Sequence, residues 1–225
     1  MVKNDLYCDT FLLSELQLLP PTQPSKIICV GLNYIDHAKE LDMPIPKNPL
    51  LFLKPPSAII GHLGRIVYPD TTKRMDYEAE LAVIIGKRCK NVRAADAGSV
   101  IMGYTCFNDV TARDLQKEDV QWTRAKSFDT FAPAGPYIAD AGMDVSDLYI
   151  KTRVNGKLRQ ESSTANLIFD VPQLIEFISG IMTLEQGDII ATGTPPGVGE
   201  LSVGDEVEVD IENVGVLKNN VVRYV

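Results

Sequence analysis

The apolar run at residues 81–85 is the feature that most limits what this chain can fold into. Every position in it is apolar, which is typical of a strand covered on both faces. Glu78 and Glu80 stand directly before it, and in an extended chain their side chains project from one face, roughly 7 Å apart. Because like charges entering a core repel each other and lose hydration, they require protons, basic partners or a metal cation. Pairing with Lys73 or Arg74, just upstream, is the simplest of these interpretations.

Size and composition indicate a globular protein with one main domain. The chain has 225 residues, of which 45% are hydrophobic and 23% charged, enough for a substantial core. A proline cluster at residues 19–25 separates a short N-terminal segment, residues 1–25, from a domain expected to span residues 26–225.

The charge balance and the cysteines narrow the function classes. Acidic residues outnumber basic ones by 30 to 22, and the sequence contains no dense cluster of lysine and arginine. Nucleic acid and anionic membranes are therefore poor candidate partners. No apolar run has the length of a membrane span, and we expect a soluble, cytoplasmic protein. The four cysteines lack C-x-x-C spacing and are expected to be reduced packing residues.

Strand-like segments outnumber helical ones. A helix is predicted at residues 34–41 and another at 171–181, where Asp170 is a candidate N-cap. Asn155-Gly156 and the turn at 213–215 predict two hairpins. These proportions favour a strand-dominated, mixed α+β fold over a doubly wound α/β fold. The predicted strands are residues 26–31, 50–53, 65–68, 80–85, 100–108, 149–154, 188–191, 206–211 and 215–222.

Asp109 is a third candidate acid, at the end of the strand-like run 103–109. If this strand neighbours that of Glu80, three carboxylates converge. A site made of oxygen ligands suits Mg²⁺, Mn²⁺ or Ca²⁺ and disfavours zinc or copper. The alternative is that Asp109 caps a helix at residues 111–116.

Two further features are candidates for catalysis or binding. His37 and Glu40 are spaced i, i+3 and share a face if their segment is helical, so the carboxylate could orient the imidazole as a base. Lys126 lies in an unusually aromatic segment, as a buried carboxylate-binding pocket requires. The alternatives are a chance surface pair and a solvated lysine.

The loop at residues 192–199 follows an apolar strand and offers hydroxyls, including that of Thr192, and closely approaching backbone amides. It lacks the Gly-Lys-Ser/Thr ending of a phosphate-binding loop, so nucleotide binding is a poor interpretation. An ordinary tight loop is the alternative.

Six segments, taken with His37 and Glu40, resemble the fumarylacetoacetate hydrolase family in order and spacing from about Lys26 onward. Each motif is weakly specific alone, but six in order make coincidence a poor explanation. They are VGLNY at 30–34, LFLKP at 51–55, YEAEL at 77–81, NDVTARDLQ at 108–116, AKSFD at 125–129 and TGTP at 192–195.

The resemblance implies a mixed β-sandwich roll, usually dimeric, with a small-molecule 2-oxo acid as substrate. The N-terminal region of this chain is shorter than in the eukaryotic fumarylacetoacetate hydrolases. The chain is therefore more similar to the compact acylpyruvase-like and hydroxymuconate-isomerase-like members of the family. The family's roles carry over as follows: Mg²⁺ or Mn²⁺ ligands Glu78, Glu80 and Asp109; a water-activating pair on a mobile segment, His37 and Glu40; a lysine that steadies substrate oxygens, Lys126; and substrate contacts Arg113, Gln116 and Thr192.

These groups support several reactions through one intermediate, a metal-bound pyruvate enolate. Because both members of the water-activating pair are present, hydrolysis of a carbon–carbon bond in an acylpyruvate-like 2,4-dioxo acid is the leading hypothesis. The alternatives are a 2-hydroxyhepta-2,4-diene-1,7-dioate or 5-carboxymethyl-2-hydroxymuconate isomerase, and an oxaloacetate decarboxylase or tautomerase. A catalytically silent, metal-binding family member is the non-enzymatic alternative.

Overall fold

Strand β6 (Ala79–Ile85) lies in the middle of the largest sheet in the computed structural model, which describes residues 18–223. Its side chains are buried on both faces of the sheet, as its apolar run predicts. The sheet is mixed, since β1 and β12 pair in parallel while β6 pairs antiparallel with both neighbours. In sheet order the strands are β2 (Leu50–Lys54), β1 (Ile27–Gly31), β12 (Ile189–Ala191), β6, β7 (Ile101–Asn108), β9 (Ala132–Asp140) and β3 (Ile59–Ile60).

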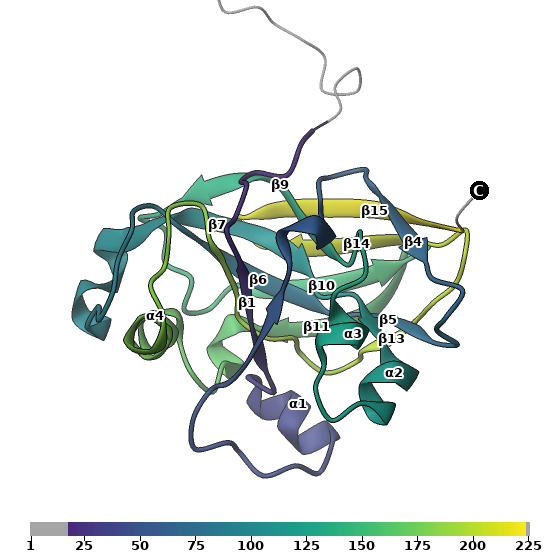
Figure 1. Ribbon diagram of the computed structural model, residues 1–225, viewed down its shortest axis with the longest axis horizontal. Coiled ribbons are helices and arrows are strands. Elements are labelled where there is room, and N and C mark those ends of the chain that lie inside the picture. Colours follow the sequence, from purple (N-terminus) through teal and green to yellow (C-terminus); the bar gives the residue numbers. More distant parts are fainter. Residues whose placement is uncertain (1–17, 224–225) are drawn as a thin grey trace, which may run out of the picture.

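A second sheet packs against the first and contributes the opposite side of the core (Figure 1). Its strand β14 alternates half-buried acids with buried Val207, Val209 and Ile211, which confirms the predicted half-exposed hairpin. In sheet order the strands are β11 (Lys157–Ser163), β10 (Tyr149–Val154), β14 (Glu206–Ile211), β15 (Gly215–Arg223) and β4 (Arg65–Tyr68). A small third sheet contains β13 (Gly199–Leu201), β5 (Met75–Tyr77) and β8 (Thr111–Ala112).

Helices occupy the margins of the sheets (Figure 1). Helix α4 (Val171–Ile181) buries its apolar stripe in the core, and the predicted N-cap Asp170 forms a reciprocal capping box with Gln173. With 11 residues, α4 is the longest helix within residues 18–223. No helix in this range is long and apolar enough to span a bilayer. The others are α1 (Ile35–Glu40), α2 (Arg113–Glu118), α3 (Thr123–Lys126) and the 3-10 turns Pro56–Ala58, Ala94–Val100 and Thr164–Asn166.

The predicted strand-dominated α+β fold is confirmed, and each predicted strand is present within one or two residues. Strand β9 and the short strands β3, β5, β8 and β13 were missed, and β11 was implied only by the hairpin predicted at Asn155-Gly156, which is present. Prolines at 133 and 136 interrupt the pattern of β9, and β11 is a largely polar edge strand. Of the four cysteines, Cys29, Cys89 and Cys106 are free thiols, as predicted, and Cys8 lies outside the described residues.

The start of the main domain is attached to β12 through the buried carboxylate of Asp188. Its Oδ1 accepts hydrogen bonds from the backbone N of Ser25 at 2.9 Å and of Lys26 at 3.2 Å, and its Oδ2 accepts from Glu185 N at 2.8 Å. The ammonium of Lys26 completes an ion pair. Although burial raises the pKa of Asp188, these donors outweigh it and the net pKa is lowered. Residues 1–17 of the predicted N-terminal segment lie outside the described residues, and the division at residue 25 stays a prediction.

We predict that Asp188→Asn lowers the free energy of unfolding by about 2 kcal/mol, because Lys26 Nζ and Glu185 N lose Oδ2 as their acceptor. The lowered pKa means that the contribution of Asp188 is present above the unfolded-state pKa of about 4 and is lost as the pH falls below it. Urea unfolding between pH 7 and pH 3 should therefore show a smaller acid-induced loss in Asp188→Asn than in the parent. Asp70→Asn, at an exposed site, is the control, and equal pH profiles for both variants would contradict the assignment.

Candidate metal centre and active site

Glu78 lies at a break between two strands, which brings three carboxylates together. It lies between the last residue of β5, Tyr77, and the first residue of β6, Ala79, so Glu78 and Glu80 do not belong to one strand. Glu80 is in β6, and Asp109 follows β7, the antiparallel neighbour of β6. The backbone N of Asp109 donates to Glu78 O at 2.8 Å. One oxygen from each of these buried carboxylates lies within 4.8 Å of the others.

Three buried or half-buried cations contact two of these acids. Lys126 Nζ donates to Glu78 Oε2 at 2.9 Å and to Asp109 Oδ2 at 2.6 Å. Arg113 forms an ion pair with the other oxygen of Glu78, and Lys54 forms one with the other oxygen of Asp109. The candidate partners just upstream are not used in this way: Arg74 binds Asp76 at 2.8 Å, and Asp76 also accepts from Arg113 at 2.8 Å.

The two glutamates differ in charge environment. Burial raises the pKa of Glu78, but Lys126 and Arg113 outweigh this and lower it to about 2. The carboxylate of Glu80 forms no ion pair with any residue in the range 18–223, and the one hydrogen bond that it accepts there comes from Gly193 N at 2.8 Å. Burial, followed by repulsion from Asp109 and Glu78, raises its pKa well above the usual value. Glu80 is thus the carboxylate that most lacks a positive partner.

This donor set fits a hard divalent cation. The ligands are all carboxylate oxygens, which Mg²⁺ and Mn²⁺ prefer, and they converge in a buried position. A cation there would supply the positive partner that Glu80 lacks. Glu78, Glu80 and Asp109 are therefore the residues that could hold the metal.

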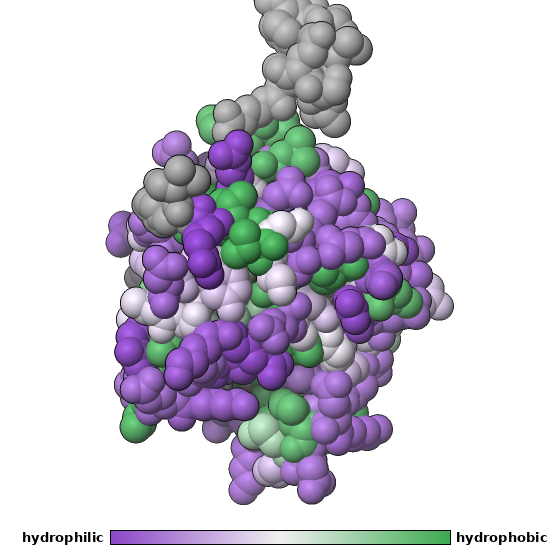
Figure 2. Space-filling view, turned by 90° about the vertical axis from the view of Figure 1, so that its right-hand side faces the viewer, coloured by the Kyte–Doolittle hydropathy of each residue, from purple (hydrophilic) through white to green (hydrophobic). Residues whose placement is uncertain are grey.

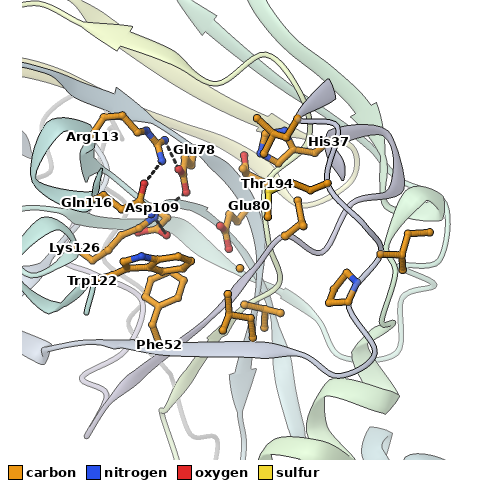
Figure 3. Close-up of a pocket in the computed structure, with 18 of the residues that line it drawn as sticks. His37, Phe52, Glu78, Glu80, Asp109, Arg113, Gln116, Trp122, Lys126 and Thr194 are labelled. Carbon is orange, nitrogen blue, oxygen red and sulfur yellow. Dashed lines mark hydrogen bonds and ion pairs between the residues drawn. The ribbon is translucent and has the colours of Figure 1, made fainter. Parts of the chain in front are cut away.

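His37 and Glu40 form the pair that their spacing predicts. Both lie on α1, and His37 Nδ1 is 2.8 Å from Glu40 Oε2. Gly197 N donates to the other oxygen of Glu40 at 3.1 Å, which orients the carboxylate. With Nδ1 facing Glu40, the second ring nitrogen of His37 is available as a base. In Figure 3 the three carboxylates lie between Lys126 and His37.

The loop after β12 donates backbone hydrogen bonds to one candidate metal ligand, Glu80, and to the partner of His37, Glu40. Gly193 N contacts Glu80 and Gly197 N contacts Glu40. Gly193 has φ +102°, and a Cβ on it would lie 2.8 Å from the Cβ of Asn33, so only glycine fits. Closely approaching amides are the property that the sequence of this loop indicates.

A cavity of about 520 Å³ joins these groups. Its acidic end contains the three carboxylates with Lys126 and Arg113 (Figure 3). Phe52 and Trp122 form part of its wall, with ring centroids 5.3 Å apart, and Lys126 Nζ lies 4.8 Å from the Phe52 centroid. The aromatic surroundings predicted for Lys126 are thus present, and its side chain is buried.

The three candidate substrate contacts occupy different positions. Arg113 and Gln116 line the cavity, and Arg113 Nη1 donates to Gln116 Oε1 at 2.5 Å. Thr192 is fully buried, its hydroxyl donates to Leu81 O at 2.9 Å, and Thr194 rather than Thr192 lines the cavity. The role assigned to Thr192 stays a prediction.

Lys54 is a site residue to which the sequence assigned no role. It is 1% exposed, and its ammonium donates to Val110 O at 3.0 Å besides pairing with Asp109. The signal for it was a lysine at the end of the apolar strand 50–53, where a charge needs a buried partner. Trp122 and Thr194 were also not predicted.

The model of the fumarylacetoacetate (FAA) hydrolase C-terminal family matches residues 26–222. The chain belongs to the fumarylacetoacetate hydrolase family. A protein from Archaeoglobus fulgidus is 62% identical over 94% of this chain and 84% of its own length, and a mitochondrial oxaloacetate tautomerase from Bos taurus is 46% identical over 93% and 70%.

Solved structures of fumarylacetoacetate hydrolase family members have the same fold. A 5-carboxymethyl-2-hydroxymuconate delta-isomerase from Mycobacterium smegmatis has a TM-score of 0.89 and 47% identity, covering 95% of this chain and 84% of its own. A maleylpyruvate hydrolase from Sphingobium sp. SYK-6, in complex with manganese(II) and pyruvate, has a TM-score of 0.83 and 39% identity, covering 94% and 75%. Homologues in this family are thus enzymes of several reaction types.

We predict that Lys54→Met lowers the free energy of unfolding by about 3 kcal/mol, because it leaves Asp109 buried with one cation fewer. The double variant Lys54→Met/Asp109→Asn should recover part of this loss, which chemical unfolding would measure as a coupling energy. Lys151→Met breaks a half-exposed pair with Glu161 and should cost less than about 1 kcal/mol. Equal losses for Lys54→Met and Lys151→Met would show that the buried pair is not needed.

Proposed function

We propose that this protein is a divalent-metal-dependent hydrolase that cleaves a carbon–carbon bond in acylpyruvate-like 2,4-dioxo acids. The observation that carries the proposal is that His37, which contacts Glu40, lines the same cavity as the three candidate metal ligands. Mg²⁺ or Mn²⁺ is the proposed cofactor, supported by the oxygen donor set and by the manganese in the Sphingobium relative. A homodimer remains a prediction from the family resemblance.

The charge balance of the site supports a dianionic intermediate. With all groups ionised, four cations offset four carboxylates, so a divalent cation would leave a net charge of +2. The enolate of a 2-oxo acid carries two negative charges, one on its carboxylate and one on its enolate oxygen, and would neutralise it. The groups counted are Asp76, Glu78, Glu80, Asp109, Lys54, Arg74, Arg113 and Lys126.

The residues divide the reaction between them. Glu40 holds His37 so that its free ring nitrogen takes a proton from water, whose oxygen bonds to C4 of the substrate. The C3–C4 bond then breaks, its electron pair forms the pyruvate enolate, and protonation at C3 yields pyruvate and a free acid. Lys126 and Arg113 add positive charge beside the enolate. A cation held by Glu78, Glu80 and Asp109 would supply Lewis-acid stabilisation of that charge.

Isomerisation or tautomerisation is the second candidate. It is supported by the identities of 47% and 46% to an isomerase and an oxaloacetate tautomerase. These reactions also need an enolate, but they move a proton and require no attack by water. A decarboxylase would use the same platform to release CO₂ from oxaloacetate.

We expect the Mg²⁺- or Mn²⁺-loaded protein to convert acetylpyruvate to pyruvate and acetate, with a coupled assay for pyruvate as the readout. Chelation with EDTA should abolish turnover, and addition of the metal should restore it. Unchanged acetylpyruvate alongside rapid isomerisation of 2-hydroxyhepta-2,4-diene-1,7-dioate would overturn the hydrolase proposal in favour of the second candidate.

His37→Ala should keep metal affinity within about twofold and lower hydrolysis by about 10²- to 10⁴-fold, because it removes the base but no metal ligand. Glu80→Gln should lose metal affinity as well as hydrolysis. Calorimetric titration with Mn²⁺ separates the two effects. Loss of Mn²⁺ binding in His37→Ala would contradict this division of roles.

A further inference from the structure

The end of the cavity away from the carboxylates is lined by apolar side chains. They come from the segment after α1 and from Leu50, the first residue of β2. Figure 2 shows apolar surface at the lower end of the molecule, the end at which α1 lies in Figure 1. The lining residues at this end are Leu41, Met43, Pro44, Ile45, Pro46 and Leu50, whereas Phe52 and Trp122 lie beside Lys126.

The lysine and arginine side chains that line the cavity form ion pairs with acids at its acidic end. Lys126 binds Glu78 and Asp109, and Arg113 binds Glu78 and Asp76. Apart from His37, which faces Glu40, the described lining residues include no other basic side chain. A carboxylate at the apolar end would therefore lose hydration without gaining an ion pair, which is strongly unfavourable.

Space and exposure also favour an apolar occupant. The cavity of about 520 Å³ lies within the range of sites that enclose drug-sized ligands, larger than a pyruvate unit needs. Leu41, Met43 and Ile45 are 49%, 50% and 57% exposed at its mouth. An alkyl or aryl chain on the substrate would cover this surface, with a favourable hydrophobic contribution.

We propose that the substrate of this site is a 2-oxo acid whose distal group is an apolar chain, and that a second carboxylate at that end is selected against. The inference rests on the proposed function, since it takes the acidic end as the site of the 2-oxo acid group. It predicts a substrate preference different from the tricarboxylate in the name of the Mycobacterium smegmatis relative.

A neighbouring cavity of about 490 Å³ is the competing place for a distal carboxylate. It shares His37, Leu41, Arg113 and Gln116 with the first and is also lined by Arg74 and Lys117. Arg74 is bound to Asp76, whereas Lys117 is exposed and forms no ion pair within residues 18–223. Lys117 is thus the side chain to vary when testing this route.

The test is calorimetric binding of unreactive ligands to the Mn²⁺-loaded protein. Oxalate comes first, because it mimics the pyruvate enolate and tests the acidic end alone. Straight-chain 2-oxo monoacids of five to eight carbons are then compared with 2-oxo diacids of equal length. We expect affinity to rise about three- to fourfold per added methylene, and the longest monoacid to bind at least about tenfold more tightly than its diacid counterpart.

Two isoleucine variants provide a matched pair. Ile45→Lys places a cation at the apolar end and should reverse the preference between monoacid and diacid. Ile181→Lys makes the same change at an equally exposed residue, 56% against 57%, at the end of α4 and outside the cavity lining, and should leave the preference unchanged.

The outcomes are distinguishable. If oxalate binds but diacids bind as tightly as monoacids, the inference is overturned while the proposed function stands. Tight diacid binding that is lost in Lys117→Met would assign the distal carboxylate to the neighbouring cavity and overturn it as well. Failure of oxalate to bind would overturn the proposed function and the inference together.

Discussion

The buried charge cluster around Asp109 is the interaction on which the rest of the site depends. Lys54 and Lys126 each bind one of its oxygens, and Lys126 and Arg113 bind those of Glu78. Removing such groups from water costs several kcal/mol per ion unless each finds partners. The break between β5 and β6 and the pairing of β6 with β7 bring these acids and cations together. The buried ions are therefore stable only when the sheets are formed.

Glu80 is the exception within this cluster and gives the site its chemistry. The neighbouring acids, Glu78 and Asp109, are paired with cations. The carboxylate of Glu80 accepts a hydrogen bond from Gly193 N but forms no ion pair within the described residues. The same loop holds Glu40 through Gly197. One segment therefore positions both the acid that lacks a cation and the acid that orients His37, which couples the candidate metal centre to the candidate base.

Local patterns predicted many of the elements and individual residues. Apolar runs and alternation predicted β6, β14 and α4, and Asp170 caps α4 as expected. The i, i+3 spacing of His37 and Glu40 sufficed for their contact, because a helical turn alone brings them together. Strands with prolines or polar edges, such as β9, have no such local pattern and were missed.

The sequence by itself determined the donor types: carboxylates without nearby histidine or cysteine ligands, a histidine–glutamate pair, and a lysine among aromatic residues. It also carried the ordered motifs of the family. Only the tertiary structure decided which charges pair, that Lys54 is buried against Asp109, and that the cavity is apolar at the end away from Glu80. The physical reason is that these contacts join residues far apart in the chain, whose distances depend on strand register and sheet packing rather than on local periodicity.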